Sequence, residues 1–329
     1  MKTVDIHTHL LSPEVSFDRL FDRFAVYFFA KNLGVDPAQL KNNPWETYVA
    51  AIAAAVKQSQ HIEKTCLFGV DSRVDKKGRQ QHRDKTVCAM NQDVLDVANR
   101  YPDQFIPFLS VNPQRPNALD LIDKYSGLGF SGAKFLQNYW GVDLNNPDFI
   151  PYYEKLRDRK LPLIVHIGSE ITIDSDKRYE GSNMLDLPLA CGVTVIAAHM
   201  GLGQFQHKLF PWRNLSRNPA WFDADYFRIL ELMEQHNNLY ADISAMLIPL
   251  RARALEHLSK QTQIHHKLLF GTDYPVPFII RMNTHGLNNS SKRNLTRITN
   301  PFDRYAATIL EFFPEHNPMY TNYQRLLTV

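Results

Sequence analysis

Asp5-Ile6-His7-Thr8-His9 ends the first apolar run of the chain. Side chains alternate between the two faces of a strand, so His7 and His9 are predicted to point the same way and Thr8 the other way. Two imidazoles on one face at the carboxyl end of a strand can share one metal ion. Taken alone, the motif also fits two histidines near a frayed terminus. The remaining sequence has to separate these two interpretations.

Eight short apolar runs follow one another, separated by longer stretches with helical spacing. The predicted strands are Thr3 to His7, Lys64 to Val70, Phe105 to Val111, Phe130 to Phe135, Leu161 to Ile167, Val193 to His199, Leu239 to Ile243 and Lys267 to Gly271. The predicted helices include Thr86 to Arg100, Phe149 to Arg159, Asp225 to Glu234 and Pro249 to Ser259. Near-continuous apolar strands that alternate with helices indicate a parallel sheet covered by helices.

Eight strand-helix units predict an α/β fold, a (β/α)8 TIM barrel. An open doubly wound sheet would need a glycine-rich phosphate loop after the first strand, and Leu10-Leu11-Ser12-Pro13-Glu14 contains none. No repeat or linker divides residues 1–329, so one domain is expected. Residues 10–63, rich in Phe and Tyr, are predicted to be a helical insertion after strand 1 that caps the barrel mouth, as is the polar stretch 283–300.

Composition excludes several classes of function. The 329 residues are 44% hydrophobic and 22% charged, which suffices for a large core. The formal net charge of +3 is spread along the chain, which gives no indication of nucleic acid or an anionic membrane as a partner. No apolar run approaches the ~20 residues that span a bilayer, and no signal segment is evident, so we expect a cytoplasmic protein.

Three cysteines, Cys66, Cys88 and Cys191, are widely separated and form no Cys-x-x-Cys pair. Neither a disulfide framework nor a thiolate zinc site is therefore expected.

Barrel enzymes place their chemistry at the carboxyl ends of the strands, and this sequence does the same. The first strand ends in His7-Thr8-His9, the fifth in Val165-His166-Ile167-Gly168, the sixth in Ala198-His199-Met200-Gly201 and the eighth in Phe270-Gly271-Thr272-Asp273. The fourth strand, Gly132-Ala133-Lys134-Phe135, adds a lysine. Five strands thus deliver chemically active side chains to one rim.

These segments, in this order, resemble the amidohydrolase superfamily, in particular the amidohydrolase-related branch that contains aminocarboxymuconate-semialdehyde decarboxylase. The resemblance covers nearly the whole chain. It includes Asn238-Leu239-Tyr240-Ala241-Asp242-Ile243-Ser244 on the seventh strand, Tyr274-Pro275 after Asp273, and the closing Asn322-Tyr323-Gln324-Arg325-Leu326-Leu327.

The resemblance implies that His7, His9, His166 and Asp273 bind one zinc ion. It also implies that His199 activates or orients the attacking water and that Asp273 hydrogen-bonds that water. The alternatives are ordinary core histidines at 166 and 199 and, for Asp273, a helix N-cap.

Lys134 is ambiguous, because an apolar strand end is a costly place for an ammonium group. It could be carboxylated and bridge two metal ions, pair with a substrate anion, or form a structural ion pair. The branch usually works with one metal, which favours the unmodified form.

Asp5 and Asp242 could orient ligand histidines, and Asp5 could instead hold the first-strand turn. Loops that overhang the site carry aromatic and basic residues suited to a flat or carboxylated small molecule, although such residues are also common in lid packing: Tyr139, Trp140, Arg178, Trp212, Arg213, Trp221 and Arg281. The aromatic residues between Phe17 and Phe29 indicate core packing or a subunit interface, and a homo-oligomer is left open.

The leading functional prediction is hydrolysis of a C–O or C–N bond in a small carboxylate, lactone or amide by metal-activated water. Non-oxidative decarboxylation of a small unsaturated or aromatic acid is the alternative. Lys134 and Met200-Gly201-Leu202-Gly203 depart from the decarboxylase pattern and modestly favour hydrolysis. A barrel that binds metal or ligand without turnover is the third hypothesis.

Overall fold

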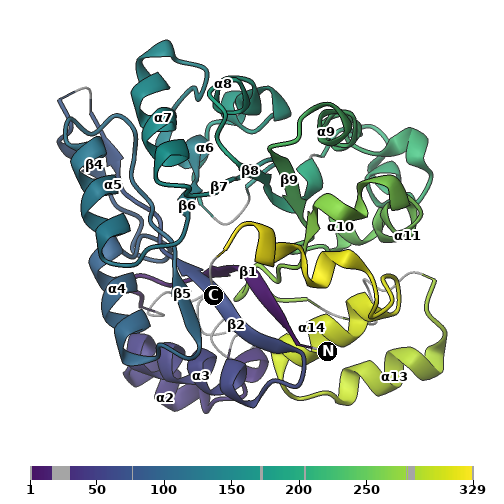
Figure 1. Ribbon diagram of the computed structural model, residues 1–329. Coiled ribbons are helices and arrows are strands. Elements are labelled where there is room, and N and C mark those ends of the chain that lie inside the picture. The colour runs from purple at the N-terminus through teal and green to yellow at the C-terminus, as the bar shows by residue number, and fades with distance from the viewer. Residues whose placement is uncertain are drawn as a thin grey trace.

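The computed structural model describes residues 2–16, 30–75, 77–170, 173–203, 205–278, 280 and 286–327. Eight parallel strands lie at its centre, and helices surround them (Figure 1). The strands are β1 (Thr3–His9), β2 (Ile62–Phe68), β5 (Phe105–Pro107), β6 (Ala133–Phe135), β7 (Leu163–Val165), β8 (Val195–Ala197), β9 (Leu239–Asp242) and β10 (Leu268–Leu269). Each overlaps one of the eight predicted runs. An antiparallel hairpin, β3 (Arg73–Val74) with β4 (Gln80–His82), was not predicted.

Two hydrogen-bonded seams close these strands into a barrel. The strands pair in the orders β1-β2-β5 and β6-β7-β8-β9-β10. At one seam Leu109 N donates to Gly132 O at 2.8 Å, beside β6. At the other, Ile6 N donates to Phe270 O at 3.0 Å and Asp273 N to His7 O at 2.8 Å. The predicted α/β TIM barrel is therefore confirmed.

Helices follow most strands. The α-helices are α2 (Pro37–Asn42), α3 (Pro44–Gln58), α4 (Asn91–Arg100), α5 (Ala118–Gly127), α6 (Gln137–Trp140), α7 (Ile150–Asp158), α8 (Asp186–Ala190), α9 (Ala224–Gln235), α10 (Pro249–Ala252), α11 (Leu255–Ser259), α13 (Asn289–Arg297) and α14 (Pro301–Leu310). The 3₁₀ helices are η1 (Pro147–Phe149), η2 (Lys177–Tyr179), η3 (Ser182–Leu185), η4 (Ala198–Gly201), η5 (Pro211–Leu215), η6 (Pro219–Trp221), η7 (Thr262–Lys267), η8 (Pro318–Tyr320) and η9 (Asn322–Arg325).

Local sequence explains where these helices begin. Asn300 caps α14, since its side chain accepts from the N–H groups of Phe302 and Asp303, and proline stands at the first helical position. In the predicted insertion 10–63, α3 buries one apolar face and packs beside β2 and α14. Residues 17–29 lie outside the described residues, so a cap formed by this insertion stays a prediction.

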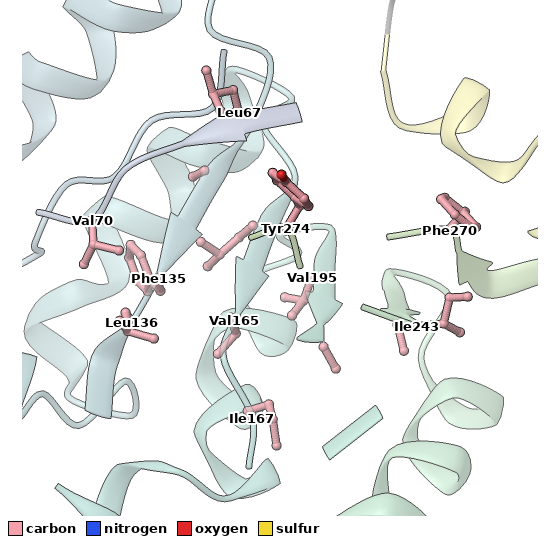
Figure 2. Packing of buried hydrophobic residues seen from close by; sticks show 14 of the residues in the cluster. Leu67, Val70, Phe135, Leu136, Val165, Ile167, Val195, Ile243, Phe270 and Tyr274 are labelled. Atoms are coloured by element: carbon pink, nitrogen blue, oxygen red, sulfur yellow. The ribbon is translucent and has the colours of Figure 1, made fainter. Parts of the chain in front are cut away.

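Alternation along the strands divides the apolar side chains into two clusters. Ile164 and Ile196 pack with Val4 and Phe68 inside the barrel. The second cluster takes residues at the alternate strand positions, and Figure 2 shows Phe135, Val165 and Val195 among its members. A residue in register with Ile164 therefore faces the barrel interior, and Lys134 is its partner on β6.

Among the described residues, no helix has both the length and the apolar composition to cross a membrane. Cys66, Cys88 and Cys191 are free cysteines, and the first two are buried.

Asp5 joins the first strand to the segment that follows the last one. It is fully buried and accepts hydrogen bonds from Thr272 N at 3.0 Å, Thr272 Oγ1 at 2.6 Å, His7 N at 3.0 Å and Thr8 Oγ1 at 3.2 Å. Of the two roles expected for Asp5, the structure supports holding the turn, because these contacts involve no imidazole ring.

Replacing Asp5 with asparagine should lower the free energy of unfolding of the metal-free protein by about 3 kcal/mol, because an amide places a donor against the donors of Thr272. Urea denaturation measures this. The control Asp174→Asn removes an exposed carboxylate paired with Arg73 and should change the free energy by less than about 1 kcal/mol. Equal effects of the two substitutions would contradict the role given to Asp5.

Candidate metal centre

Five predicted site residues come together at the carboxyl ends of the strands. His7 and His9 end β1, His166 follows β7, His199 lies in η4 directly after β8, and Asp273 follows β10. We call these five residues the histidine–aspartate cluster.

Three members of the cluster converge on one point. His7 Nε2 and His9 Nε2 lie 3.4 and 3.2 Å from Asp273 Oδ1. One ligand atom from each of the three residues lies within 4.8 Å of the others, which is a spacing that one metal ion can bridge. His7 and Asp273 are buried, and the His9 side chain is 18% exposed.

His166 and His199 extend the cluster. The His199 ring lies 5.1 Å from the ring of His7 and 5.1 Å from that of His166, centroid to centroid. His199 Nε2 lies 3.8 Å from Asp273 Oδ2, and His166 Nε2 lies 4.0 Å from Glu170 Oε2. His166 is thus adjacent to the group of three without being part of it.

Several buried polar atoms of the cluster make no hydrogen bond to a described residue. They are His9 Nδ1, His166 Nε2 and Asp273 Oδ1. Buried polar atoms normally find partners, so such atoms need an explanation. Imidazole nitrogens and a carboxylate oxygen are the ligand set that zinc prefers, and the arrangement therefore fits a metal ion.

Hydrogen bonds define the protonated nitrogen of two rings. His7 Nδ1 lies 2.8 Å from Asp242 Oδ2, and His199 Nδ1 lies 3.0 Å from the carbonyl oxygen of Ser244. Because a carboxylate and a carbonyl only accept, both Nδ1 atoms carry the proton. In the neutral rings, Nε2 of His7 and of His199 therefore carries a lone pair directed at the cluster.

Ser244 lies close to Nδ1 of both His7 and His199. Its hydroxyl lies 3.1 Å from His7 Nδ1 and 2.8 Å from His199 Nδ1, and it donates to Asp242 Oδ1. Asp242 also accepts from the backbone N–H of His199 at 2.9 Å. The expected orienting role of Asp242 thus has a structural basis. The role of Ser244 was not predicted, although its spacing of two residues from Asp242 is that of side chains on one face of a strand.

The surroundings favour neutral imidazoles and charged carboxylates. Burial lowers the pKa of His7, and it lowers the pKa values of His166 and His199 well below the usual range, with Lys134 or Arg251 adding to the effect. Burial alone would raise the pKa of Asp273, but the interactions with His7, His199 and His9 outweigh it and hold that pKa well below its ordinary value. These protonation states suit metal binding.

The side chain of Lys134, on β6, extends to the histidine–aspartate cluster. Its side chain is fully buried, and Nζ lies 3.3 Å from His7 Nε2 and 5.5 Å from the centre of the Phe68 ring. Burial lowers the pKa of Lys134 to about 8, although Asp273, Asp242 and Glu170 oppose this shift. An amine with this pKa has a sizeable neutral fraction near neutral pH, which carboxylation requires.

Strained backbone accumulates around the cluster. Non-glycine residues with positive φ include His199 at 61°, Met200 at 52°, Ala245 at 50° and Asp273 at 63°. Such conformations cost about 1 kcal/mol or more each and persist where the surrounding structure enforces them. Here they aim side chains from the strand ends at one point.

Of the two roles left open for the aromatic and basic loop residues, the structure supports packing for Tyr139 and Trp140. Tyr139 is buried, with its hydroxyl 3.2 Å from His82 Nδ1, and Trp140 Nε1 donates to Asp71 O at 2.8 Å, so both are packing residues. Arg213 stacks on Trp221 at 3.8 Å, and Arg178 pairs with Asp176. Trp212 is exposed, and Arg281 lies outside the described residues.

Replacing Asp242 with asparagine should weaken zinc binding about 10- to 100-fold, because the amide no longer fixes the His7 ring with Nε2 toward the cluster. Competition with a chelator measures the affinity. Asp158→Asn, which removes an exposed carboxylate beside Arg157, is the matched control and should leave it unchanged. Wild-type affinity in the Asp242 variant would show that the ring is oriented by other contacts.

Comparisons with known proteins agree with this fold. The probable 2-pyrone-4,6-dicarboxylic acid hydrolase from Acinetobacter baumannii, with citric acid bound, has a TM-score of 0.56 at 16% identity, and 99% of each chain is covered. 2,6-Dihydroxybenzoate decarboxylase complexed with 2,6-dihydroxybenzoate has a TM-score of 0.52 at 16% identity, again with 99% of each chain covered. An uncharacterised TIM-barrel protein from Bordetella bronchiseptica has a TM-score of 0.55 at 19% identity, covering 94% of this chain and 99% of that one.

At these identities the solved structures show a common fold only. A search of curated proteins found no match. The amidohydrolase family model, however, matches residues 4–278, which is most of the chain. The chain therefore belongs to the amidohydrolase family of metal-dependent enzymes.

Proposed function

We propose that this protein hydrolyses a C–O or C–N bond of a small carboxylate, lactone or amide. One observation carries the proposal. His7, His9 and Asp273 place three ligand atoms within 4.8 Å of one another, and the unprotonated Nε2 of His199 lies 3.8 Å from Asp273 Oδ2. A metal-ligand set and an adjacent base are the two parts that hydrolysis by activated water requires.

The residues that would hold the metal are His7 through Nε2, His9, His166 and Asp273. Three neutral imidazoles and one carboxylate are donor types that suit a single zinc ion. Zinc bound there would supply a water whose pKa is lowered to about 7.

His199 is the proposed base. Its Nε2 can accept a proton from the attacking water, because Nδ1 already holds its proton against Ser244 O. Asp273 Oδ2, 3.8 Å from Nε2, would stabilise the imidazolium that forms. Since its pKa stays low, Asp273 also remains an acceptor that can orient the water.

Metal removal and replacement of His199 test the proposal together. Chelated protein should lose turnover and regain it with zinc. The variant His199→Asn should keep wild-type zinc content and lose about 10²- to 10⁴-fold in kcat, because the metal ligands remain while the base is gone. Metal analysis and steady-state kinetics give the two readouts. Loss of zinc from the variant would instead make His199 a ligand.

Product analysis separates hydrolysis from its alternatives. Suitable first substrates are 2-pyrone-4,6-dicarboxylate and 2,6-dihydroxybenzoate, after which two of the structural neighbours are named. Ring opening or amine release supports hydrolysis, whereas release of carbon dioxide would replace the proposal with decarboxylation. Metal binding without turnover across lactones, amides and acids would indicate a binding barrel.

Metal stoichiometry tests the state of Lys134. We expect one zinc ion per chain with or without added bicarbonate, because an unmodified ammonium beside His7 cannot bridge two ions. Lys134→Met should then keep one ion per chain, as should the surface control Lys155→Met, which removes a partner of Asp123. Two ions in the wild type and one in Lys134→Met would show a carboxylated, bridging lysine.

A further inference from the structure

A buried arginine that was not predicted as a site residue lies beside the histidine–aspartate cluster. Arg251 lies in α10, and only 6% of its side chain is exposed. Its Nε donates to Leu202 O at 3.0 Å, and its Nη1 lies 3.9 Å from Asp273 Oδ2. Asp273 therefore contacts both neighbours: its Oδ1 faces His7 and His9, and its Oδ2 faces the guanidinium of Arg251.

Most donors of Arg251 remain available. A guanidinium carries five N–H donors, and neither Nη group of Arg251 forms a hydrogen bond with any residue that the structure describes. The buried Arg253 differs, because it donates from Nε to Leu250 O, from Nη1 to Trp221 O and from Nη2 to Asp223 Oδ2. Arg253 has the pattern of a structural arginine, and Arg251 does not.

The local backbone holds the guanidinium of Arg251 in place. A Cβ on Gly203 would lie 3.4 Å from Nε and 3.5 Å from Nη2 of Arg251, so the bare glycine backbone forms one wall beside the group. The bond from Nε to Leu202 O anchors the guanidinium, and the Nη groups, of which Nη1 lies 3.9 Å from Asp273 Oδ2, form no hydrogen bond with a described residue. A guanidinium anchored through Nε, with Nη donors still available, can bind a planar anion such as a carboxylate.

Charge in the site favours the same kind of ligand. The charged groups that act on Arg251 include the carboxylates of Asp273, Glu170 and Asp242, and Lys134 is the other buried cation nearby. A divalent ion bound there would add two positive charges to the site that already holds Arg251 and Lys134. A buried excess charge is costly unless a partner neutralises it, and a substrate carboxylate would do so.

We propose that Arg251 binds a carboxylate of the substrate and holds it beside the metal-binding residues, which makes the substrate a small carboxylic acid. This inference rests on the proposed function. It specifies one member of the proposed substrate range and assigns Arg251 a binding role, in which the Nη edge donates to both oxygens of the anion.

Ligand binding to the zinc-loaded protein tests this role without requiring turnover. The probes are acetate, benzoate, phthalate and citrate, each compared with the corresponding uncharged amide by calorimetry. At least one carboxylate should bind the wild type, with its amide at least about tenfold weaker. Arg251→Lys, which keeps the charge but loses the fork, should weaken that carboxylate about tenfold, and Arg251→Gln about 100-fold.

Zinc content and melting temperature are measured on the same samples. Both Arg251 variants should retain the zinc content of the wild type, and Arg157→Gln, on the exposed surface of α7, is the control for loss of one positive charge. Equal carboxylate binding by wild type and Arg251→Gln would overturn the inference. So would failure of all four carboxylates to bind, or loss of zinc from the Arg251 variants, which would give Arg251 only a supporting role toward Asp273.

The two proposals fail in distinguishable ways. Absence of zinc binding by the wild type would contradict the proposed metal centre itself. Zinc binding with hydrolysis of an uncharged lactone or amide, unaffected by Arg251→Gln in both KM and kcat, would leave the proposed function standing and remove the role of Arg251.

Discussion

Closure of the barrel between its first and last strands is the constraint on which the site depends. Asp273 N donates to His7 O at 2.8 Å and His9 N donates to Tyr274 O at 2.8 Å, so the backbone pairing itself sets the proposed ligands side by side. Asp5 adds side-chain bonds across the same seam. These residues lie more than 260 positions apart in the sequence, and the ligand set consequently exists only in the closed barrel. Metal binding and folding are therefore linked, because an ion that binds only the folded chain stabilises it.

The histidine–aspartate cluster and the charged residues around it have features that oppose stability. Lys134 and Arg251 are buried cations, Asp242 and Asp273 are buried carboxylates, and His199 has a left-handed backbone conformation. Burying a charge costs several kcal/mol unless it is paired, and strained residues persist only where neighbours enforce them. The two apolar clusters, inside the barrel and between strands and helices, supply the rigid frame that enforces this geometry.

The sequence predicted the architecture well because the deciding signals are local. Apolar runs separated by helical stretches predict parallel strands, and His7, His166, His199 and Asp273 stand within four residues of the carboxyl ends of such strands. Ser244 and Arg251 escaped prediction, because their importance arises from contacts with residues far away in the chain. Pairing of β1 with β2 is irregular between Asp5 and Thr8, which places His7 inside the barrel although Val4 and Ile6 also face inward. Simple alternation does not predict such an irregularity.

Two aspartates of the site show how one residue type acquires different roles. Asp242 is surrounded by donors, since it accepts from His7 Nδ1, His199 N, Ser244 N and Ser244 Oγ. Asp273 is equally buried, yet its Oδ1 faces two imidazole nitrogens and forms no hydrogen bond with a described residue. A carboxylate whose acceptors are all used can only orient its donors. A carboxylate with an unused buried oxygen can bind a cation, and this difference in hydrogen bonding is the physical ground for assigning orientation to Asp242 and metal binding to Asp273.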